Sequence, residues 1–255
     1  MQFEFVILDW AAYADSLTQP SEWLAWALGP PVLPAKQVAV VPPLTEMPAM
    51  MRRRVDRLGR MACQVAYWCQ PSAAQVPMVF ASRYGDAARS LSLLGDLVQG
   101  QALSPTGFGL SVHNAVSALY SIARGDTQNT VVVAAGRATV EAALVEAMAL
   151  LADGAPEVLV VVYEAPLPGD YSVFQDEDPC EYAWAWRIAL PQLGTKQDVV
   201  VRVKVQPDAL AQAPSAEWPD WPTGLLVLRH VLQNMATPQG AGGPPLVLER
   251  ACLNA

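Results

Sequence analysis

Short runs of β-branched and aromatic residues alternate along the chain with longer segments that carry apolar residues at helical spacing. The short runs predict β-strands and the longer segments predict helices. We expect strands over Phe3–Leu8, Val76–Ser82, Thr130–Val133, Val158–Glu164, Glu181–Leu190 and Asp198–Val205. We expect helices over Ser21–Leu28 (with Ser21 as the N-cap), Met50–Cys69, Ala87–Gln99, Leu110–Arg124 and Gly224–Met235, and one more that ends at Leu151. This alternation of strands and helices indicates an α/β layered domain.

Segments rich in proline and glycine separate these elements. Gly29–Pro48 contains so many prolines that it cannot form a regular helix, and we expect a long excursion over the surface. Loops are expected over Gly100–Gly109 and Pro166–Pro179, a connector over Pro207–Pro222, and a flexible turn in the glycine-rich tail. No internal repeat is present, so residues 1–255 are expected to form a single domain.

The segment Thr130–Leu151 joins a short β-branched strand to an Ala/Leu-rich helix through a turn of small residues. Such a turn holds the nucleophile in many α/β enzymes, because it aims one side chain at the N-terminus of the helix. The residues at this turn are Ala135, Gly136, Arg137 and Ala138. None of them is Ser or Cys. The segment therefore predicts the frame of a catalytic elbow without its nucleophile.

The composition points to a protein that associates with another chain. It is 53% hydrophobic and 16% charged, which is apolar for a soluble monomer and suggests a surface covered by a partner. The formal net charge of −8 argues against nucleic acid or an anionic membrane as the main partner. No uncharged run reaches the roughly 18 residues of a membrane span, and the N-terminus lacks the features of a signal peptide. We expect a cytoplasmic protein without a membrane span.

Neither the cysteines nor the acidic residues form a metal-site pattern. The four cysteines are Cys63, Cys69, Cys180 and Cys252. Their spacing fits neither a disulfide framework nor a zinc site, and we expect Cys63 and Cys69 to be buried as small hydrophobic residues. An acidic cluster follows in a loop at Asp176, Glu177 and Asp178. Because no spaced His accompanies these carboxylates, we expect a solvated loop and no metal.

From residue 76 to residue 164 the elements follow one another in a specific order. They are a strand, a helix, the loop SPTGF, the helix SVHNAVSALYSIARG, the strand TVVV, the small-residue turn, the helix VEAALVEAMALLADG and the strand VLVVVYE. This order resembles the N-terminal half of β-ketoacyl synthases of the thiolase fold, with Leu144–Met148 matching the helix after the nucleophile and Asn114 an Asn of the preceding buried helix. The resemblance is good over residues 50–165 and looser over 1–205, and residues 207–255 would be a C-terminal extension. It implies a layered α/β half-domain in which a βαβαβαββ mixed sheet is flanked by helices.

Two departures from the family pattern decide which members the chain resembles. The nucleophilic Cys of the family would fall near Gly136 or Arg137, and neither residue can form an acyl thioester. The catalytic histidines of the family lie in a second half-domain that we do not expect here. The chain has only His113, expected in the buried helix with a hydrogen bond, and His230, expected at the surface. A short ketosynthase half without the Cys resembles chain-length-factor subunits of type II polyketide systems, most of all the truncated ones of aryl polyene synthesis.

This resemblance implies a non-catalytic subunit that pairs with a Cys-containing β-ketoacyl synthase, as a heterodimer or a dimer of heterodimers. The pair would elongate a polyketide or polyene acyl chain by decarboxylative condensation of malonyl units. An acyl carrier protein would deliver the growing chain on phosphopantetheine, so the subunit itself needs no cofactor. A residual role for Arg137, such as anchoring a malonyl carboxylate, stays open.

The resemblance also implies which residues meet the partner. The strand residues Thr130, Val131, Val132 and Val133 would pair across the two-fold axis, since an unpaired strand edge needs a partner. The loop Ser104–Leu110 would close the end of the partner's acyl tunnel. Its candidate side chains are those of Thr106, Gly107, Phe108 and Leu110. A bulky Phe108 would shorten the tunnel as a steric ruler; the alternative is that Phe108 is an ordinary core residue.

A basic run precedes the first long apolar helix segment. Its members are Arg52, Arg53, Arg54, Arg57 and Arg60. The first four could contact an acidic carrier protein or the phosphate of phosphopantetheine. The alternative is that the run forms the solvated face of a helix.

A function of a different class also stays open. A stand-alone α/β acyl-thioester hydrolase or transferase would need a nucleophile beside a base, and the options are Ser111 with His113, or Ser82. Ser111 and His113 are two positions apart, so their side chains diverge by about 200° on a helix, which argues against a dyad. A third possibility is a scaffold protein that kept the fold and has no link to acyl chains.

Overall fold

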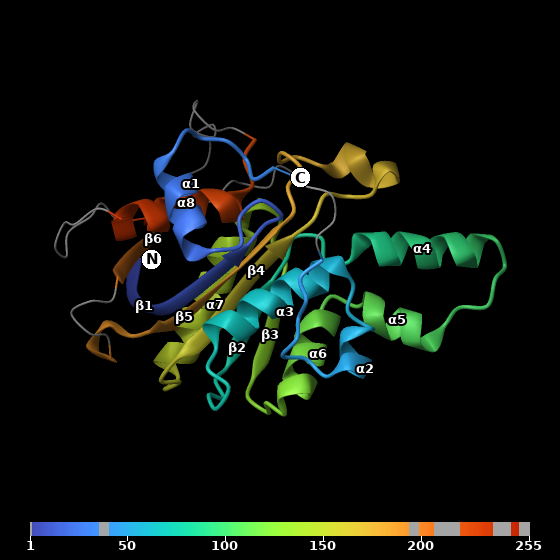
Figure 1. Ribbon diagram of the computed structural model, residues 1–255, viewed down its shortest axis with the longest axis horizontal. Coiled ribbons are helices and arrows are strands. Elements are labelled where there is room, and N and C mark those ends of the chain that lie inside the picture. The colour runs from blue at the N-terminus through green and yellow to red at the C-terminus, as the bar shows by residue number, and fades with distance from the viewer. Residues whose placement is uncertain (1, 36–40, 194–198, 207–219, 237–245, 250–255) are drawn as a thin grey trace.

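The computed structural model describes residues 2–35, 41–193, 199–206, 220–236 and 246–249 (Figure 1). Its strands are β1 (Gln2–Tyr13), β2 (Met78–Ala81), β3 (Thr130–Val133), β4 (Val158–Glu164), β5 (Tyr182–Ala189), β6 (Val199–Gln206) and β7 (Leu246–Glu249). Its α-helices are α1 (Pro20–Leu28), α2 (Ala49–Arg52), α3 (Arg57–Cys69), α4 (Ala87–Val98), α5 (Pro105–Ser111), α6 (Ala115–Arg124), α7 (Thr139–Ala152) and α8 (Thr223–Ala236). Three short 3₁₀ segments are η1 (Gly136–Ala138), η2 (Gly169–Phe174) and η3 (Pro191–Leu193).

The strands form one mixed sheet in the order β3-β2-β4-β5-β1-β6-β7. β2 is parallel to both of its neighbours, with Phe80 opposite Val132 of β3 and Val161 of β4. β5 and β1 are antiparallel to the strands on either side of them. The predicted mixed sheet flanked by helices is therefore confirmed. The strand β7 was not predicted, because its few residues stand in a segment rich in glycine and proline.

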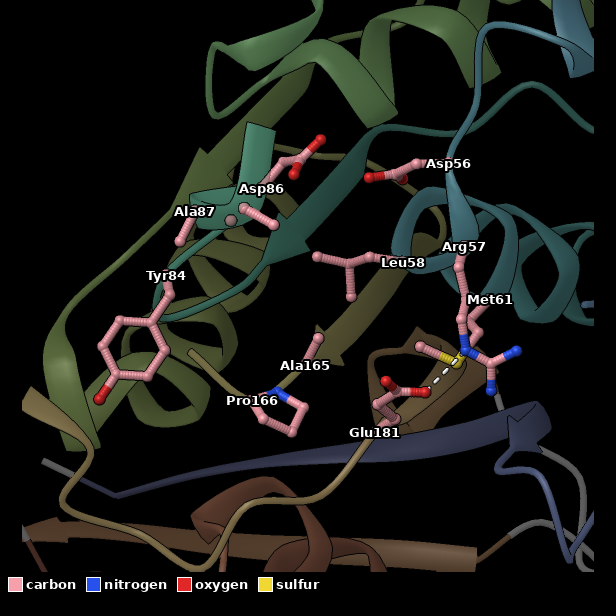
Figure 2. Close-up of a pocket in the computed structure, with 12 residues that line it drawn as sticks. Asp56, Arg57, Leu58, Met61, Tyr84, Asp86, Ala87, Ala165, Pro166 and Glu181 are labelled. Atoms are coloured by element: carbon pink, nitrogen blue, oxygen red, sulfur yellow. Dashed lines mark hydrogen bonds and ion pairs between the residues drawn. The ribbon is translucent and has the colours of Figure 1, made fainter. Parts of the chain in front are cut away.

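The predicted helix Met50–Cys69 is divided in the structure, so its prediction as one helix is wrong. α2 ends at Arg52 and α3 begins at Arg57. Asp56 causes the new start, because its side chain accepts a hydrogen bond from the amide of Gly59 (2.8 Å) and so caps α3. Figure 2 shows Asp56 at this end of the helix. The start of α1 also differs from the prediction: Glu22, and not Ser21, accepts hydrogen bonds from the backbone ahead of the helix, at the Gln19 amide (2.9 Å).

The predicted loop Gly100–Gly109 contains the start of a helix. The hydroxyl of Ser104 caps α5 by accepting a hydrogen bond from the Gly107 amide (3.1 Å), and Pro105 occupies the first turn, where its fixed φ fits. The predicted helix Leu110–Arg124 accordingly begins only at Ala115. The pair Ser104-Pro105 is a helix-start signal, and it was not used when this segment was predicted to be a loop.

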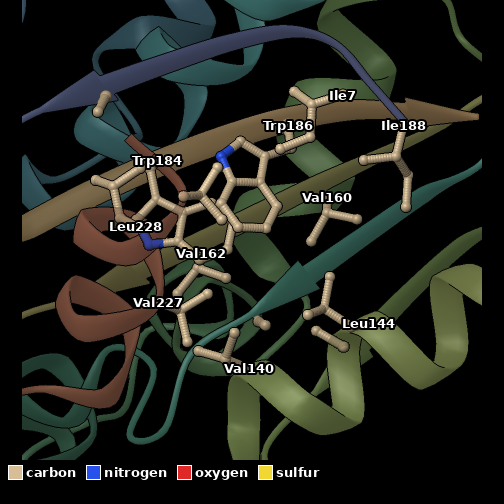
Figure 3. Packing of buried hydrophobic residues seen from close by; sticks show 14 of the residues in the cluster. Ile7, Val140, Leu144, Val160, Val162, Trp184, Trp186, Ile188, Val227 and Leu228 are labelled. Atoms are coloured by element: carbon tan, nitrogen blue, oxygen red, sulfur yellow. The ribbon is translucent and has the colours of Figure 1, made fainter. Parts of the chain in front are cut away.

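Each face of the sheet is covered by helices, and the alternation of side chains along the central strands fills both. On β4, Val158, Val160 and Val162 belong to the cluster under α1, α7 and α8, while Leu159, Val161 and Tyr163 belong to the cluster under α3. This double burial is why β4 is a continuous apolar run. Figure 3 shows Trp184 and Trp186 of β5 packed among side chains of α7, α8 and β4.

Some predicted features fall on residues that are not described. They are most of the connector Pro207–Pro222, the glycine-rich tail at 240–245 and Cys252. Among the helices of the described ranges, none combines the length and apolar character needed to cross a membrane.

Two helical glycines provide a test of the packing between β5 and α8. A Cβ on Gly224 would lie 3.0 Å from two ring carbons of Tyr182 and closer still to its hydroxyl. Tyr182 is fully buried, so we expect Gly224→Ala to lower the free energy of unfolding by about 1–3 kcal/mol. Gly95 of α4 has open space around it, and the control Gly95→Ala should raise stability by up to about 1 kcal/mol. Urea denaturation of both variants measures this, and equal effects would contradict the packing described.

Candidate functional site

The turn between β3 and α7 has the geometry of a strand-to-helix elbow. Gly136 has a backbone φ of 59°, a left-handed conformation that glycine adopts without steric cost. The hydroxyl of Thr139 closes the turn: it accepts a hydrogen bond from the Ala135 amide (3.0 Å) and donates one to the Gly136 carbonyl (2.6 Å). The predicted frame is present, with Arg137 next to Gly136 at the position considered for a nucleophile.

Arg137 lies beside the carboxylate of Glu177, which is the centre of a network of charges. Nε of Arg137 is 3.7 Å from Oε1 of Glu177, and Nη1 of Arg83 is 3.3 Å from Oε2. The same carboxylate accepts hydrogen bonds from the hydroxyl (2.7 Å) and the amide (3.3 Å) of Thr223, the first residue of α8. Glu177 therefore joins the elbow, the end of β2 and the N-terminus of α8, where a negative charge is favourable.

Further contacts hold the segment around η2 against the end of β2. Arg83 forms an ion pair with Asp176, and the Tyr84 hydroxyl lies 3.1 Å from the carbonyl oxygen of Phe174. Burial disfavours the charge of the Arg83 guanidinium, but its acidic partners raise its pKa above the usual value. The prediction that the acidic residues form a solvated loop is wrong for Glu177, whose side chain is only 9% exposed.

Glu164, the last residue of β4, lies next to this network. Its carboxyl group accepts hydrogen bonds from the amide of Arg83 and from the hydroxyl of Ser82 (3.3 Å). Burial raises the pKa of Glu164 to about 8, and the charge of Glu177 adds to this effect. A cavity of about 20 Å³ remains here, which has room for about one water molecule. An acyl chain does not fit into this space.

Among the strands that the structure describes, β3 lies at the edge of the sheet and β2 is its single neighbour. Thr130 is exposed, and Val131, Val132 and Val133 are half-buried. The helices α4 and α5 are linked to β3 through α6, which contacts both α5 and β3. α4 and α5 pack against each other, and Figure 1 shows them projecting away from the sheet. Neither helix has a fully buried residue among those described. This end of the molecule therefore combines a free strand edge with two helices that lack a covering layer.

The predicted tunnel-capping residues lie on α5. Phe108 is 63% exposed, so the alternative that it is a core residue is wrong for this chain. Thr106 is also exposed, whereas Gly107 and Leu110 are half-buried. The prediction that Asn114 lies in a buried helix is wrong: Asn114 is exposed at the N-cap of α6, and that helix is only partly buried.

His113 is half-buried against the end of β2. Its Nδ1 would lie 2.6 Å from a Cβ on Gly85, whose φ of 58° favours glycine. Its Nε2 is a buried atom without a hydrogen-bond partner among the described residues, so the predicted hydrogen bond at this atom is absent there. His230 is also partly buried, and burial lowers its pKa, so its prediction as a surface residue is wrong.

Comparison with known proteins shows to which family the chain belongs. The sequence profile described as "Beta-ketoacyl synthase, N-terminal domain" matches residues 23–242. The chain belongs to this β-ketoacyl synthase family. This membership confirms the resemblance seen in the sequence and the ketosynthase-like layered fold. A comparison with curated proteins gives no match.

Solved ketosynthase structures resemble this chain along most of its length. A ketosynthase (ApeO) in complex with its chain length factor (ApeC) from Xenorhabdus doucetiae matches with a TM-score of 0.74 and 25% identity, over 91% of this chain and 92% of that chain. The ishigamide ketosynthase/chain length factor matches with a TM-score of 0.58 and 19% identity, over 75% of this chain and 63% of that one. The ketosynthase from module 6 of the bacillaene synthase from Bacillus subtilis 168 matches with a TM-score of 0.54 and 11% identity, over 78% of this chain and 39% of that one. The last two likenesses show the fold alone.

The residues considered for a stand-alone acyl-thioester enzyme are engaged elsewhere in this ketosynthase-like chain. The hydroxyl of Ser111 donates a hydrogen bond to the carbonyl of Phe108 (2.8 Å), and Ser82 donates to Glu164. Burial raises the pKa values of Cys63, Cys69 and Cys180, which keeps these thiols protonated and unreactive. The burial expected for Cys63 and Cys69 is confirmed. These contacts disfavour the hydrolase or transferase alternative.

Three of the basic residues are used inside the chain. Arg57 forms ion pairs with Asp15 and Glu181. Arg52 donates a hydrogen bond to the Leu44 carbonyl (3.1 Å), and Arg60 donates one to the Val55 carbonyl (3.2 Å). Arg53 and Arg54 are exposed. The solvated-face interpretation is therefore wrong for Arg57, and Arg53 and Arg54 remain as surface charges.

Arg83 and Glu164 were not predicted from the sequence as members of the site. Glu164 ends β4 and Arg83 closely follows β2, and these two strands are parallel neighbours. The carboxyl ends of parallel strands meet at one edge of the sheet, so polar residues that end two apolar strands were the available signal.

The charge network at the elbow can be tested through Glu177. We expect Glu177→Gln to lower the free energy of unfolding by about 2–3 kcal/mol, because Arg83 and Arg137 then lose a charged partner in a largely buried place. The control Asp178→Asn removes a neighbouring charge for which no ion pair is seen in the described region, and its effect should stay within about 0.5 kcal/mol. Denaturant titration measures both. Equal effects of the two variants would show that Glu177 does not hold the elbow.

Proposed function

We propose that this chain is a non-catalytic, chain-length-factor-like subunit. It pairs with a Cys-containing β-ketoacyl synthase, and the heterodimer elongates a polyketide or polyene acyl chain by decarboxylative condensation. One observation carries the proposal: the elbow that presents a nucleophile in catalytic α/β folds has Arg137 beside Glu177, with space for about one water molecule nearby. A site closed in this way leaves the condensation to another subunit.

The size of the matched relative supports the pairing. The match to the ApeO/ApeC complex covers nearly equal shares of both chains, so the matched chain is about as long as this one. The other two reported ketosynthase structures are longer chains, of which this chain spans 63% and 39%. A short ketosynthase-fold chain thus occurs within a complex of a ketosynthase and its chain length factor.

We assign the free edge of β3 and the adjacent helices to the partner interface. The exposed large hydrophobic residues on and between α4, α5 and α6 are Leu94, Leu97, Val98, Leu103, Phe108, Val112 and Ile122. An unpaired strand edge beside such a surface is a site of association with another chain. By this proposal β3 pairs with a strand of the partner, and Phe108 extends towards the end of the partner's acyl tunnel.

The remaining parts of the proposal follow from the same pairing. The chain acts as a single ketosynthase-like domain and needs no cofactor of its own, since an acyl carrier protein delivers the acyl chain on phosphopantetheine. Arg53 and Arg54 are the basic residues that stay exposed for contact with that acidic carrier or its phosphate. Arg137, with its charge directed at Glu177, serves to close the elbow.

Co-expression with a Cys-containing β-ketoacyl synthase tests the pairing. We expect a stable 1:1 complex, and we expect the double variant Leu97→Asp/Val98→Asp to weaken it by roughly tenfold or more, because burying each side chain contributes about 1.5–3 kcal/mol. Leu28→Asp is the control, since Leu28 is equally apolar and exposed but lies at the end of α1. Sedimentation of the purified proteins measures the dissociation constants. A chain that purifies well as a monomer and ignores the ketosynthase would refute the pairing.

The role of Phe108 can be tested in the assembled pair. If its ring closes the end of the partner's tunnel, Phe108→Ala should lengthen the acyl products, because it removes the bulk that stops chain growth. Mass spectrometry of carrier-bound products gives the chain length. The control Phe174→Ala removes an equally exposed ring from η2 and should leave product length unchanged. Products of unchanged length from both variants would show that Phe108 does not close the end of the partner's tunnel.

A further inference from the structure

The helices α4 and α5 form an arm that carries the proposed partner surface. We call residues 86–112 the arm; it begins directly after Gly85 and ends directly before His113. Within it α4 packs against α5, and Figure 1 shows both helices projecting away from the sheet. Neither helix has a fully buried residue. The arm therefore has no core of its own, and the contacts that set its direction lie where it joins the body of the protein.

The two helices of the arm are in close contact with each other. A Cβ on Gly107 of α5 would lie 3.5 Å from Cδ2 of Leu93 of α4, which is an ordinary van der Waals distance. Elements packed in this way move together when the chain turns at a hinge. A turn at the place where the arm joins the body therefore moves Phe108 of α5 together with both helices.

The two ends of the arm meet at His113. A Cβ on Gly85 would lie 2.6 Å from Nδ1, 3.1 Å from Cε1 and 3.6 Å from Cγ of His113, so the imidazole ring lies directly against the Gly85 backbone. With a φ of 58°, Gly85 is suited both to this left-handed conformation and to the space that the ring occupies. The amide of Gly85 donates a hydrogen bond to the hydroxyl of Ser82 (2.9 Å), directly after β2. The ring of His113 thus connects the exit of the arm with its entry and with the sheet.

His113 also stands at the turn between the arm and the body. α5 ends at Ser111, Val112 is extended (φ −70°, ψ 148°), and α6 begins at Ala115. α6 packs against α3 and β3 and so belongs to the body. Nε2 of His113 is closed off from solvent and has no hydrogen-bond partner among the described residues, so the ring acts through its packing. Residues that end one element and begin the next are the ones that absorb the rotation of a hinge.

The charged contacts at the start of α4 hold the arm less firmly. Arg89 is 2.7 Å from Asp86 and 3.8 Å from Asp56, the cap of α3, and Figure 2 shows the two aspartates side by side. The side chains of Arg89 and Asp56 are 26% and 33% exposed. Ion pairs that solvent reaches contribute little to stability. The packing of His113 against Gly85 is therefore the contact that fixes the arm.

We propose that His113 is a positioning residue for acyl chain length: its ring holds the arm in one direction relative to the sheet and so sets where Phe108 stands in the partner's tunnel. Phe108 lies little more than one helical turn before His113, so a displacement at the ring is passed on to it directly. The role in chain length rests on the proposed function. The holding of the arm is a property of the chain alone.

Distance measurements by pulsed electron paramagnetic resonance on the full chain test the holding of the arm. One spin label is attached at Ser92→Cys on α4 and one at Ala152→Cys at the end of α7, both at exposed positions. Cys252→Ser is included, and Cys63, Cys69 and Cys180 are buried. We expect one narrow distance distribution in the parent chain. His113→Ala should make it at least about twofold wider, because the arm then turns over a larger range at its hinge.

A second variant and two controls separate the role of His113 from a general loss of stability. Gly85→Ala places a Cβ where the ring lies and should widen or shift the distribution in the same way. His230→Ala removes the other histidine of the chain, which is partly buried in α8, and should leave the distribution unchanged. Arg89→Ala should have a smaller effect than His113→Ala. A distribution that His113→Ala and Gly85→Ala leave unchanged, or that Arg89→Ala widens as much, would overturn the proposal.

The acyl products of the assembled pair test the role in chain length. With the ketosynthase in saturating excess, we expect His113→Ala to change the ratio of longer products to the main product by about tenfold, which corresponds to about 1.4 kcal/mol between the competing barriers. The products should cover a broader range of lengths than those of Phe108→Ala, because the ring of Phe108 is retained but is no longer held in one place.

The two measurements separate failure of this proposal from failure of the proposed function. A wider distance distribution with unchanged products would overturn the role in chain length and leave His113 a structural residue. A chain that does not pair with the ketosynthase would refute the proposed function and with it the role in chain length. The distance measurement on the chain alone would then still decide whether His113 holds the arm.

Discussion

The carboxylate of Glu177 draws together three segments that are far apart in the sequence. It lies within ion-pair distance of Arg137 at the elbow and of Arg83 after β2, and it accepts two hydrogen bonds from Thr223 at the start of α8. Without this carboxylate both guanidinium groups would lose a charged partner and Thr223 would lose an acceptor in a largely buried place, which is costly. This one side chain thus ties the elbow, the segment after β2 and the start of α8 together.

A second constraint acts at the edge of the sheet. Among the described strands β3 has a neighbour on one side only, and α4 and α5, which reach it through α6, have no fully buried residue within the described ranges. The centre of the sheet is different, because Trp184 and Trp186 fill one face and α3 packs closely over Ala183 and Ala185 on the other. The molecule is thus well packed around β4 and β5, whereas the sheet edge at β3 and the helices α4 and α5 lack a covering layer among the described residues. Together, a closed elbow and an open edge support the proposal of a subunit that contributes surface and leaves the chemistry to its partner.

The sequence predicted the elements whose residues carry a strong local signal. β4 is a continuous apolar run and α4 has regular amphipathic spacing, and both appear close to the expected bounds. The division at Asp56 and the start of α5 at Ser104 depend on single capping hydrogen bonds, which hydrophobic periodicity does not reveal. Of the site, only the strand, the small-residue turn and the helix that follows it could be predicted from the sequence. Arg137 is paired with Glu177 of the loop after η2, and Glu177 in turn accepts hydrogen bonds from Thr223 of α8. Such long-range pairs are decided by tertiary packing.

The central claim is that this chain shapes a condensation carried out by another subunit. Its most direct test is the formation of β-ketoacyl-carrier protein from malonyl-carrier protein and an acyl-carrier protein, measured by mass spectrometry on the assembled pair before and after the partner's nucleophilic Cys is changed to Ala. The account predicts that this substitution abolishes condensation and that the present chain alone has none. Condensation by the chain alone, or by the pair without the partner's Cys, would contradict it.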